Sequence, residues 1–187
     1  MRIALALAVL LMPGTTGAQW DQAISDKELL DPWIQTSAVL HTLAADDSTA
    51  AATGREFVQL EEDLASLRVQ LENTAISIVG RPEFAYDAAQ WSFELSQQVQ
   101  KVGQGLDAMF AELSVADRPD VKAARAAIAG FHDILAGRSR FERDVLTTVG
   151  SGSKNAMQAL AARWWTAADR VDDLRSAVVG LQRRAER

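Results

Sequence analysis

Apolar residues in the last part of the chain recur with the spacing of a heptad repeat. From Met157 to Leu181 they follow one another at alternating intervals of three and four positions, which places them along one side of a helix. The members of this stripe are Met157, Leu160, Trp164, Ala167, Val171, Leu174, Val178 and Leu181. A stripe of this length is stable only when other helices cover it, so the pattern predicts a helical bundle.

A second stripe with the same spacing extends from Phe57 to Ile78 and predicts another long helix. Residues 53–56 match a capping box and mark the expected start of this helix. We expect Gly80 to adopt the left-handed conformation that ends a helix, and Pro82 to begin the next one.

The third predicted helix extends from Pro82 to Leu113. Its stripe contains one insertion relative to strict heptads and consists of Ala88, Trp91, Leu95, Val99, Val102, Leu106, Met109 and Leu113. Gly103 and Gly105 lie inside this helix, where a glycine costs about 1 kcal/mol relative to alanine. We therefore expect close helix packing or a bend at these two positions.

A fourth stripe follows Pro119 and is interrupted by the Gly-Arg-Ser segment at 137–139. Gly137 could end one helix and Ser139 could cap another, or a single helix could continue with a kink. A continuous helix up to Val149 matches the length of the other long helices and covers the bundle along its whole length. We therefore predict a kinked but unbroken helix.

Near the N-terminus, Ser25 and Glu28 have the spacing of a capping box, but Asp31 and Pro32 follow at once. Proline fits the first turn of a helix better than its interior. We expect the capping box to open only one turn, and a short helix to extend from Pro32 to Ala45.

These patterns predict an all-α fold for residues 19–187. Short connections force neighbouring helices to run antiparallel. The expected architecture is an up-down-up-down bundle of four long helices, with the short N-terminal helix packed alongside.

Residues 1–18 have the features of a secretory signal peptide. Arg2 supplies a positive start, residues 3–12 are apolar, and the segment ends with small residues up to Ala18. We expect cleavage before Gln19 and a periplasmic or extracellular location. No later stretch is long and apolar enough to span a bilayer, so we expect no transmembrane segment after cleavage.

The composition narrows the possible partners and cofactors. The chain has a formal net charge of −6 and no cysteine. An acidic protein is a poor match for nucleic acid, and the lack of cysteine excludes disulfides and Cys-based zinc sites. The two histidines, His41 and His132, lack the Glu-x-x-His spacing of di-iron bundles. We expect no metal, no cofactor and, without a catalytic motif, no enzymatic activity.

The tryptophans are candidates for packing or for recognition. We expect Trp164 to lie in the core because it belongs to the heptad stripe. Trp165 is one position off the stripe, and we expect it to pack beneath the first helix, against Trp33. The alternative is that Trp165 is an exposed aromatic anchor for a partner.

Helix three carries a cluster of glutamines at Gln90, Gln97, Gln98, Gln100 and Gln104. We interpret this cluster as an uncharged polar face in contact with solvent, with a self-association surface as the alternative. The residues that we select as candidate partner contacts are Trp33, Trp165, Gln97, Gln100 and Gln104.

The all-helical, exported and glutamine-bearing plan resembles, in general layout, minor pilus subunits of type IV secretion systems. It also resembles periplasmic ligand-sensing four-helix bundles, but lacks the flanking membrane helices of a sensor receptor. Our first hypothesis is a non-catalytic interaction or scaffold component of the bacterial envelope, associated with a secretion apparatus. The alternative is a bundle that binds a small ligand in a pocket near Gly103, Gly105 and Trp91.

Overall fold

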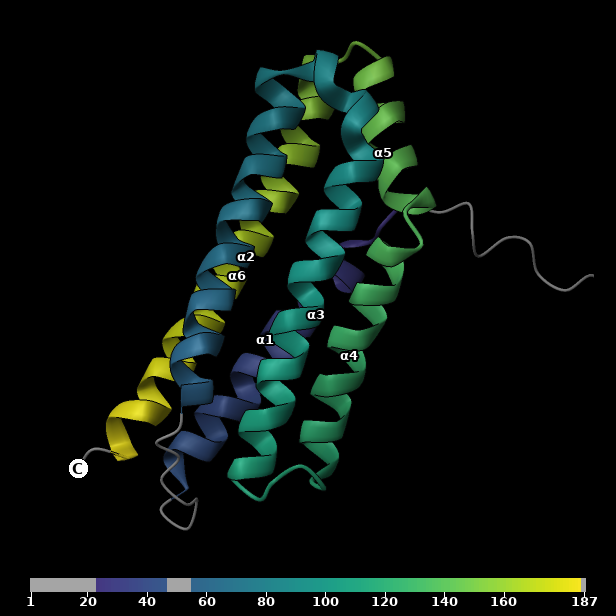
Figure 1. Ribbon diagram of the computed structural model, residues 1–187. Coiled ribbons are helices and arrows are strands. Elements are labelled where there is room, and N and C mark those ends of the chain that lie inside the picture. Colours follow the sequence, from purple (N-terminus) through teal and green to yellow (C-terminus); the bar gives the residue numbers. More distant parts are fainter. Residues whose placement is uncertain (1–22, 47–54, 186–187) are drawn as a thin grey trace, which may run out of the picture.

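Helices account for almost all of the residues described by the computed structural model, which are 23–46 and 55–185. No strand occurs among them, so the predicted all-α class is confirmed. The elements are α1 (Asp26–Ala45), α2 (Arg55–Gly80), the 3-10 helix η2 (Pro82–Asp87), α3 (Ala88–Glu112), α4 (Pro119–Ala136), α5 (Ser139–Gly150) and α6 (Lys154–Ala185) (Figure 1). The predicted signal peptide at 1–18 and the start of the capping box at 53–56 lie outside the described residues.

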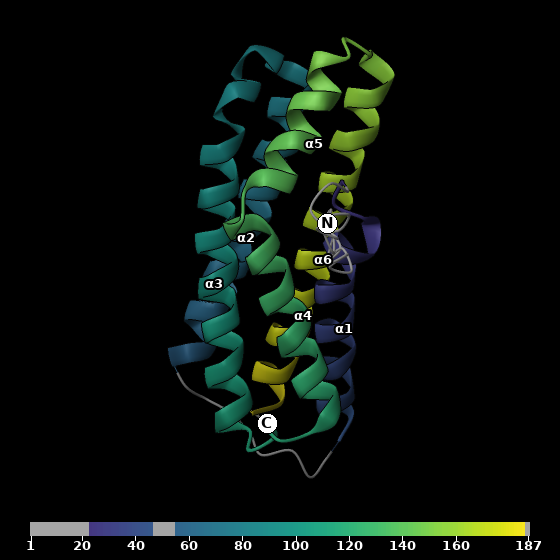
Figure 2. The same cartoon turned by 90° about the vertical axis from the view of Figure 1, so that its right-hand side faces the viewer.

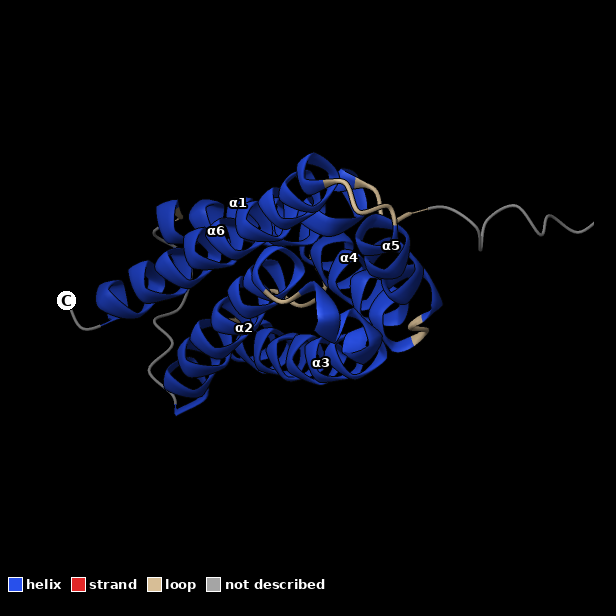
Figure 3. Ribbon diagram, turned by 90° about the horizontal axis from the view of Figure 1, so that it is seen from above, coloured by secondary structure: helices blue, strands red, loops and turns tan. Residues whose placement is uncertain are grey.

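The helices lie side by side along one long direction, and α1 occupies a place within the bundle. α2 packs on α3 and α6, and α3 packs on α4. α1 packs on both α4 and α6 (Figure 2), whereas α5 packs directly on α6. Viewed from above, these elements surround a common interior (Figure 3). In the half of the molecule that contains α4, α1 therefore lies between α4 and α6. In the half that contains α5, no helix of the described residues separates α5 from α6.

The N-terminal helix is longer than its sequence predicts. α1 begins at Asp26, after Ser25, and the predicted capping box with Glu28 is present. The expectation that this box opens only one turn is wrong, because Pro32 lies inside the helix and is buried. A proline in a helix interior costs about 3 kcal/mol. The full burial of Ile24, Leu29 and Trp33 on the same segment offsets this cost.

The predicted kinked helix is in fact two helices, and the expectation of a continuous helix is wrong. The break falls at Arg138, which has φ 58° and ψ −43°. The Ser139 N–H donates to the Gly137 carbonyl oxygen at 2.6 Å, which closes a γ-turn with positive φ. Because the helix breaks here, α4 leaves space for α1. α5, after the break, packs directly on α6.

The core contains most residues of the four predicted stripes together with apolar residues of α1, whereas the stripe members Trp91 and Met157 are only partly buried. Leu64, Leu71 and Leu174 are completely buried, and Trp164 is 1% exposed. Phe141 of α5 packs edge-on against Trp164, with ring centroids 5.1 Å apart. The predicted apolar stripes therefore do form the interior.

The sequence predicts a particular local structure at three glycines, Gly80, Gly103 and Gly105. A Cβ on Gly105 would lie 3.0 Å from Leu60 Cδ1, and a Cβ on Gly103 would lie 3.4 Å from Ile128 Cγ2. These distances confirm the expected close packing of α3. The expected left-handed Gly80 is wrong, because Gly80 is the last residue of α2 and its φ is not positive.

Candidate functional site

A groove of about 460 Å³ lies between α3 and α4. We call it the α3/α4 groove. Its apolar lining consists of Val99, Leu106, Phe110 and Ile128 with Ala126 and Ala129, and Gly103 also borders it. Space remains here because Gly103, Ala126 and Ala129 carry little or no side chain.

Polar groups surround this apolar lining. Asp107, Lys122, Arg125 and His132 all border the groove. Arg125 Nε and Asp107 Oδ1 are 2.5 Å apart and link α4 to α3. The hydrogen bond to Asp107 raises the pKa of Arg125 above its ordinary value. The groove therefore combines apolar area with polar groups that are mostly uncharged or paired.

Two other polar side chains of the groove also lie beside carboxylates. Lys122 Nζ lies 2.9 Å from Asp117 Oδ1. His132 Nδ1 lies 3.1 Å from Asp133 Oδ1. These contacts are on or near the surface, where a single ion pair contributes only about 0–1 kcal/mol. A bound partner can therefore rearrange them at small energetic cost.

The predicted glutamine face is present on α3, with one exception. Gln97, Gln100 and Gln104 are exposed, and Gln100 and Gln104 border the α3/α4 groove. Gln98 is 4% exposed, and its Nε2 donates to the Asp63 carbonyl oxygen of α2 at 2.8 Å. The interpretation of Gln98 as a solvent-facing residue is therefore wrong. Its amide instead ties α3 to α2.

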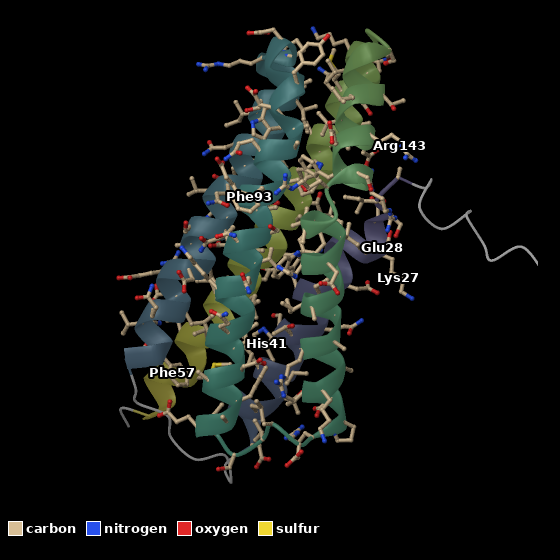
Figure 4. All side chains as sticks on the ribbon, turned by 45° about the vertical axis from the view of Figure 1, so that its right-hand side comes forward. Lys27, Glu28, His41, Phe57, Phe93 and Arg143 are labelled. Atoms are coloured by element: carbon tan, nitrogen blue, oxygen red, sulfur yellow. The ribbon has the colours of Figure 1, made fainter. Side chains whose placement is uncertain are left out.

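The exposed face of α3 continues to Phe93, beyond the end of the groove. Phe93 lies four positions before Gln97 on the same side of the helix and is 38% exposed. The Arg138 guanidinium carbon lies 5.0 Å from the centroid of this ring, so Phe93 meets the α4–α5 junction (Figure 4). Phe93 is not among the candidate residues predicted from the sequence. The spacing of positions 93, 97, 100, 104 and 107 contains the signal that would have found it.

Of the two candidate tryptophans, Trp33 lies entirely in the core. It is 0% exposed and packs edge-on against Phe131 of α4, with ring centroids 5.6 Å apart. The selection of Trp33 as a partner contact therefore needs correction, because no partner can reach this indole in the present structure.

Trp165 is 38% exposed, and the expectation that it packs beneath the first helix is wrong. Arg163 Nε lies 2.5 Å from Asp26 Oδ1, so this side of α6 faces α1. Trp165 follows Arg163 by two positions, a rotation of about 200° around the helix. The indole therefore lies on a different side of α6 from α1.

The pocket expected near Gly103, Gly105 and Trp91 is not a single site. Gly103 borders the α3/α4 groove, whereas Gly105 faces Leu60 of α2. Trp91 borders a separate pocket of about 180 Å³ between α2 and α3. Of these three residues, only Gly103 borders the α3/α4 groove.

Among residues 23–46 and 55–185, no cluster of three or more His, Asp or Glu side chains is arranged to hold a metal ion. In the same part of the chain, no helix has the length and hydropathy to cross a membrane. Compared with models of protein families, with curated proteins and with solved structures, the chain shows no significant match. The residues of the groove are therefore the basis for a functional proposal.

Proposed function

We propose that the protein is an exported, non-catalytic interaction or scaffold component of the bacterial envelope, associated with a secretion apparatus. In this proposal, an up-down-up-down helical scaffold binds a helical segment of a partner protein in the α3/α4 groove. One observation carries the proposal. A continuous face from Phe93 to Asp107 combines exposed amides with an apolar groove whose opposite wall contains two small residues, Ala126 and Ala129.

The dimensions of this face suit a helix. Phe93 and Asp107 are separated by 14 positions, or about 21 Å along α3. A partner helix of about 14 residues has the same length. The small side chains of Ala126 and Ala129 allow a partner backbone to approach α4 closely. The apolar lining can receive partner residues spaced by three or four positions, as in other helix-in-groove complexes.

The polar residues of this face specify the character of the partner. The amides of Gln97, Gln100 and Gln104 can each donate and accept hydrogen bonds. They are suited to a partner with uncharged polar residues beside its apolar ridge. The ion pair between Arg125 and Asp107 already neutralises the charges at one end. We therefore expect binding to depend more on packing than on salt concentration.

A photo-crosslinking amino acid in place of Gln100, introduced in the native host, tests this proposal. We expect a discrete adduct with one protein of the envelope. A second substitution, Ala129→Trp, fills the groove and should abolish the adduct while changing the melting temperature by less than about 3 °C. The control is Ala123→Trp on the exposed surface of α4 outside the groove lining, which should leave the adduct intact. An adduct that survives Ala129→Trp contradicts the proposal.

A second candidate function is the binding of a small molecule in the same groove. Its volume of about 460 Å³ lies within the range of about 300–1,000 Å³ that is usual for small-molecule sites. Lys122 and Arg125 at the rim favour a ligand with an apolar body and a carboxylate. Native mass spectrometry of protein purified from the host distinguishes the two functions. A small adduct that Ala129→Trp removes, without any protein crosslink, supports this second function.

A further inference from the structure

α2 exposes a row of apolar side chains on the side that faces away from the core. Val58 is 49% exposed, Val69 51%, Ile76 49% and Val79 40%. The separations of 11 positions between Val58 and Val69 and of 7 between Val69 and Ile76 each correspond to a nearly whole number of helical turns, and Val79 is rotated about 60° around the helix from Ile76. These side chains therefore lie along one side of α2. The other side of α2 forms the core, so these exposed side chains are not part of it.

Trp165 of α6 belongs to the same surface. Asp172 follows Trp165 by seven positions, so the two residues lie on one side of α6. Asp172 Oδ1 lies 3.1 Å from Arg68 Nη1 of α2. α2 and α6 run in opposite directions side by side (Figure 1). The residue seven positions before Asp172 on α6 therefore lies level with the residue about seven positions after Arg68 on α2. This places Trp165 beside Ile76. We call the surface formed by Val58, Val69, Ile76, Val79 and Trp165 the α2/α6 face.

The two ends of the row on α2 are related by position about Val69, whereas the position that mirrors Ile76 is Glu62. Val58 and Val79 are almost equally distant in sequence from Val69. Two α2 helices that cross a two-fold axis near Val69 in opposite directions would place Val69 against its own copy. They would also place Val58 of each copy against Val79 of the other. A two-fold interface requires this self-complementarity, because each residue must meet its counterpart in both directions.

The face is large enough for a stable dimer. α2 contains 26 residues and is about 39 Å long. Two helices packed side by side present a width of about 18–20 Å, which gives about 700 Å² for each copy. Two copies would bury about 1,400 Å² in total, which lies within the range of about 1,200–2,000 Å² for specific interfaces.

We propose that the α2/α6 face binds a second copy of this chain, with the two α2 helices antiparallel about a two-fold axis near Val69. Trp165 of each copy then lies over the first half of the second copy's α2 and supplies the large aromatic contact. This surface is distinct from the α3/α4 groove, so a dimer leaves both grooves accessible. The outcome is a two-fold scaffold with one partner site on each copy.

Sedimentation of the purified chain over a range of concentrations tests the proposal. We expect a monomer–dimer equilibrium whose dissociation constant rises by about tenfold or more in Val69→Glu and in Trp165→Ala. The matched control is Ile34→Glu, which also changes an exposed apolar residue (45% exposed) but lies on α1. It should leave the equilibrium unchanged. A chain that stays monomeric at about 100 μM would overturn the proposal.

Crosslinking tests the orientation, and the absence of native cysteine keeps the experiment simple. Val69→Cys should form a crosslinked dimer with a short bifunctional maleimide. Val58→Cys and Val79→Cys should each crosslink weakly alone and efficiently when the two variants are mixed. The control Ile34→Cys should not crosslink. A dimer that crosslinks at Ile34→Cys but not at Val69→Cys, or a face occupied by another protein on a monomeric chain, contradicts this arrangement.

Discussion

Arg140, in the first turn of α5, holds the carboxylate of Glu28, in the first turn of α1, through two hydrogen bonds of 2.8 Å. The same carboxylate accepts hydrogen bonds from the N–H and Oγ of Ser25 and completes the cap of α1. Arg140 also donates to the carbonyl oxygen of Ala23 at 2.9 Å. One side chain therefore joins the start of α1 to the α4–α5 junction, near which Glu28 lies (Figure 4).

This contact predicts a pH-dependent part of the stability. The hydrogen bond from Arg140 lowers the pKa of Glu28 from its ordinary value of 4.5 to about 2. Because the folded state lowers this pKa, the stabilisation is complete above about pH 4.5 and is lost as the pH falls to about 2. Glu28→Gln should reduce the free energy of unfolding by about 1–2 kcal/mol at pH 7, after allowance for partial exposure.

Urea unfolding at several pH values measures this effect. The difference between wild type and Glu28→Gln should shrink steadily between about pH 4.5 and 2. Glu112→Gln, a change at an exposed position on α3, should alter stability by less than about 0.5 kcal/mol. A difference between wild type and Glu28→Gln that is constant with pH would show that the Arg140 contact does not control it.

The γ-turn at Arg138 predicts a preference for glycine. A non-glycine residue with positive φ is strained by about 1–2 kcal/mol. Arg138→Gly and Arg138→Ala both lose the contact with Phe93, but only glycine relieves the backbone strain. Thermal unfolding should therefore show Arg138→Gly to be more stable than Arg138→Ala by about 1 kcal/mol. Equal stability of the two variants would argue against a strained γ-turn with positive φ at this position.

The two adjacent tryptophans predict opposite consequences of substitution. Trp164→Ala should destabilise the fold by about 3–5 kcal/mol, because Trp164 is 1% exposed. Trp165→Ala should cost the monomer about 1 kcal/mol or less. Iodide quenching provides the second measurement. Trp165→Phe should reduce the fluorescence that iodide quenches, whereas Trp164→Phe should not.

The heptad stripes predict large effects at the fully buried leucines. Leu64→Ala, Leu71→Ala and Leu174→Ala should each lower the free energy of unfolding by about 2–5 kcal/mol. Ile34→Ala is the comparison, since Ile34 is 45% exposed, and it should cost less than about 1 kcal/mol. Denaturant titrations of these variants measure the differences. Small losses at two or more of the leucines would contradict the assigned core.

Local sequence determined the features that depend on neighbouring positions along one helix. The spacing of apolar residues in α2, α3, α4 and α6 decides which side of each helix is buried, because helical periodicity links positions three and four apart. The cap formed by Ser25 and Glu28 is local in the same way. Within the candidate site, helical periodicity alone predicted that the amides of Gln97, Gln100 and Gln104 are exposed.

Only the tertiary structure decided the features that depend on contacts between distant segments. α1 passes through Pro32 because Ile24, Leu29 and Trp33 are buried against other helices. The helix breaks at Arg138 because α1 lies between α4 and α6 on one side of the junction only. Phe93 meets Arg138, Gln98 reaches α2 and Trp165 faces away from α1 for the same reason. Each of these outcomes depends on which surface another helix covers, and the periodicity of a single helix does not contain that information.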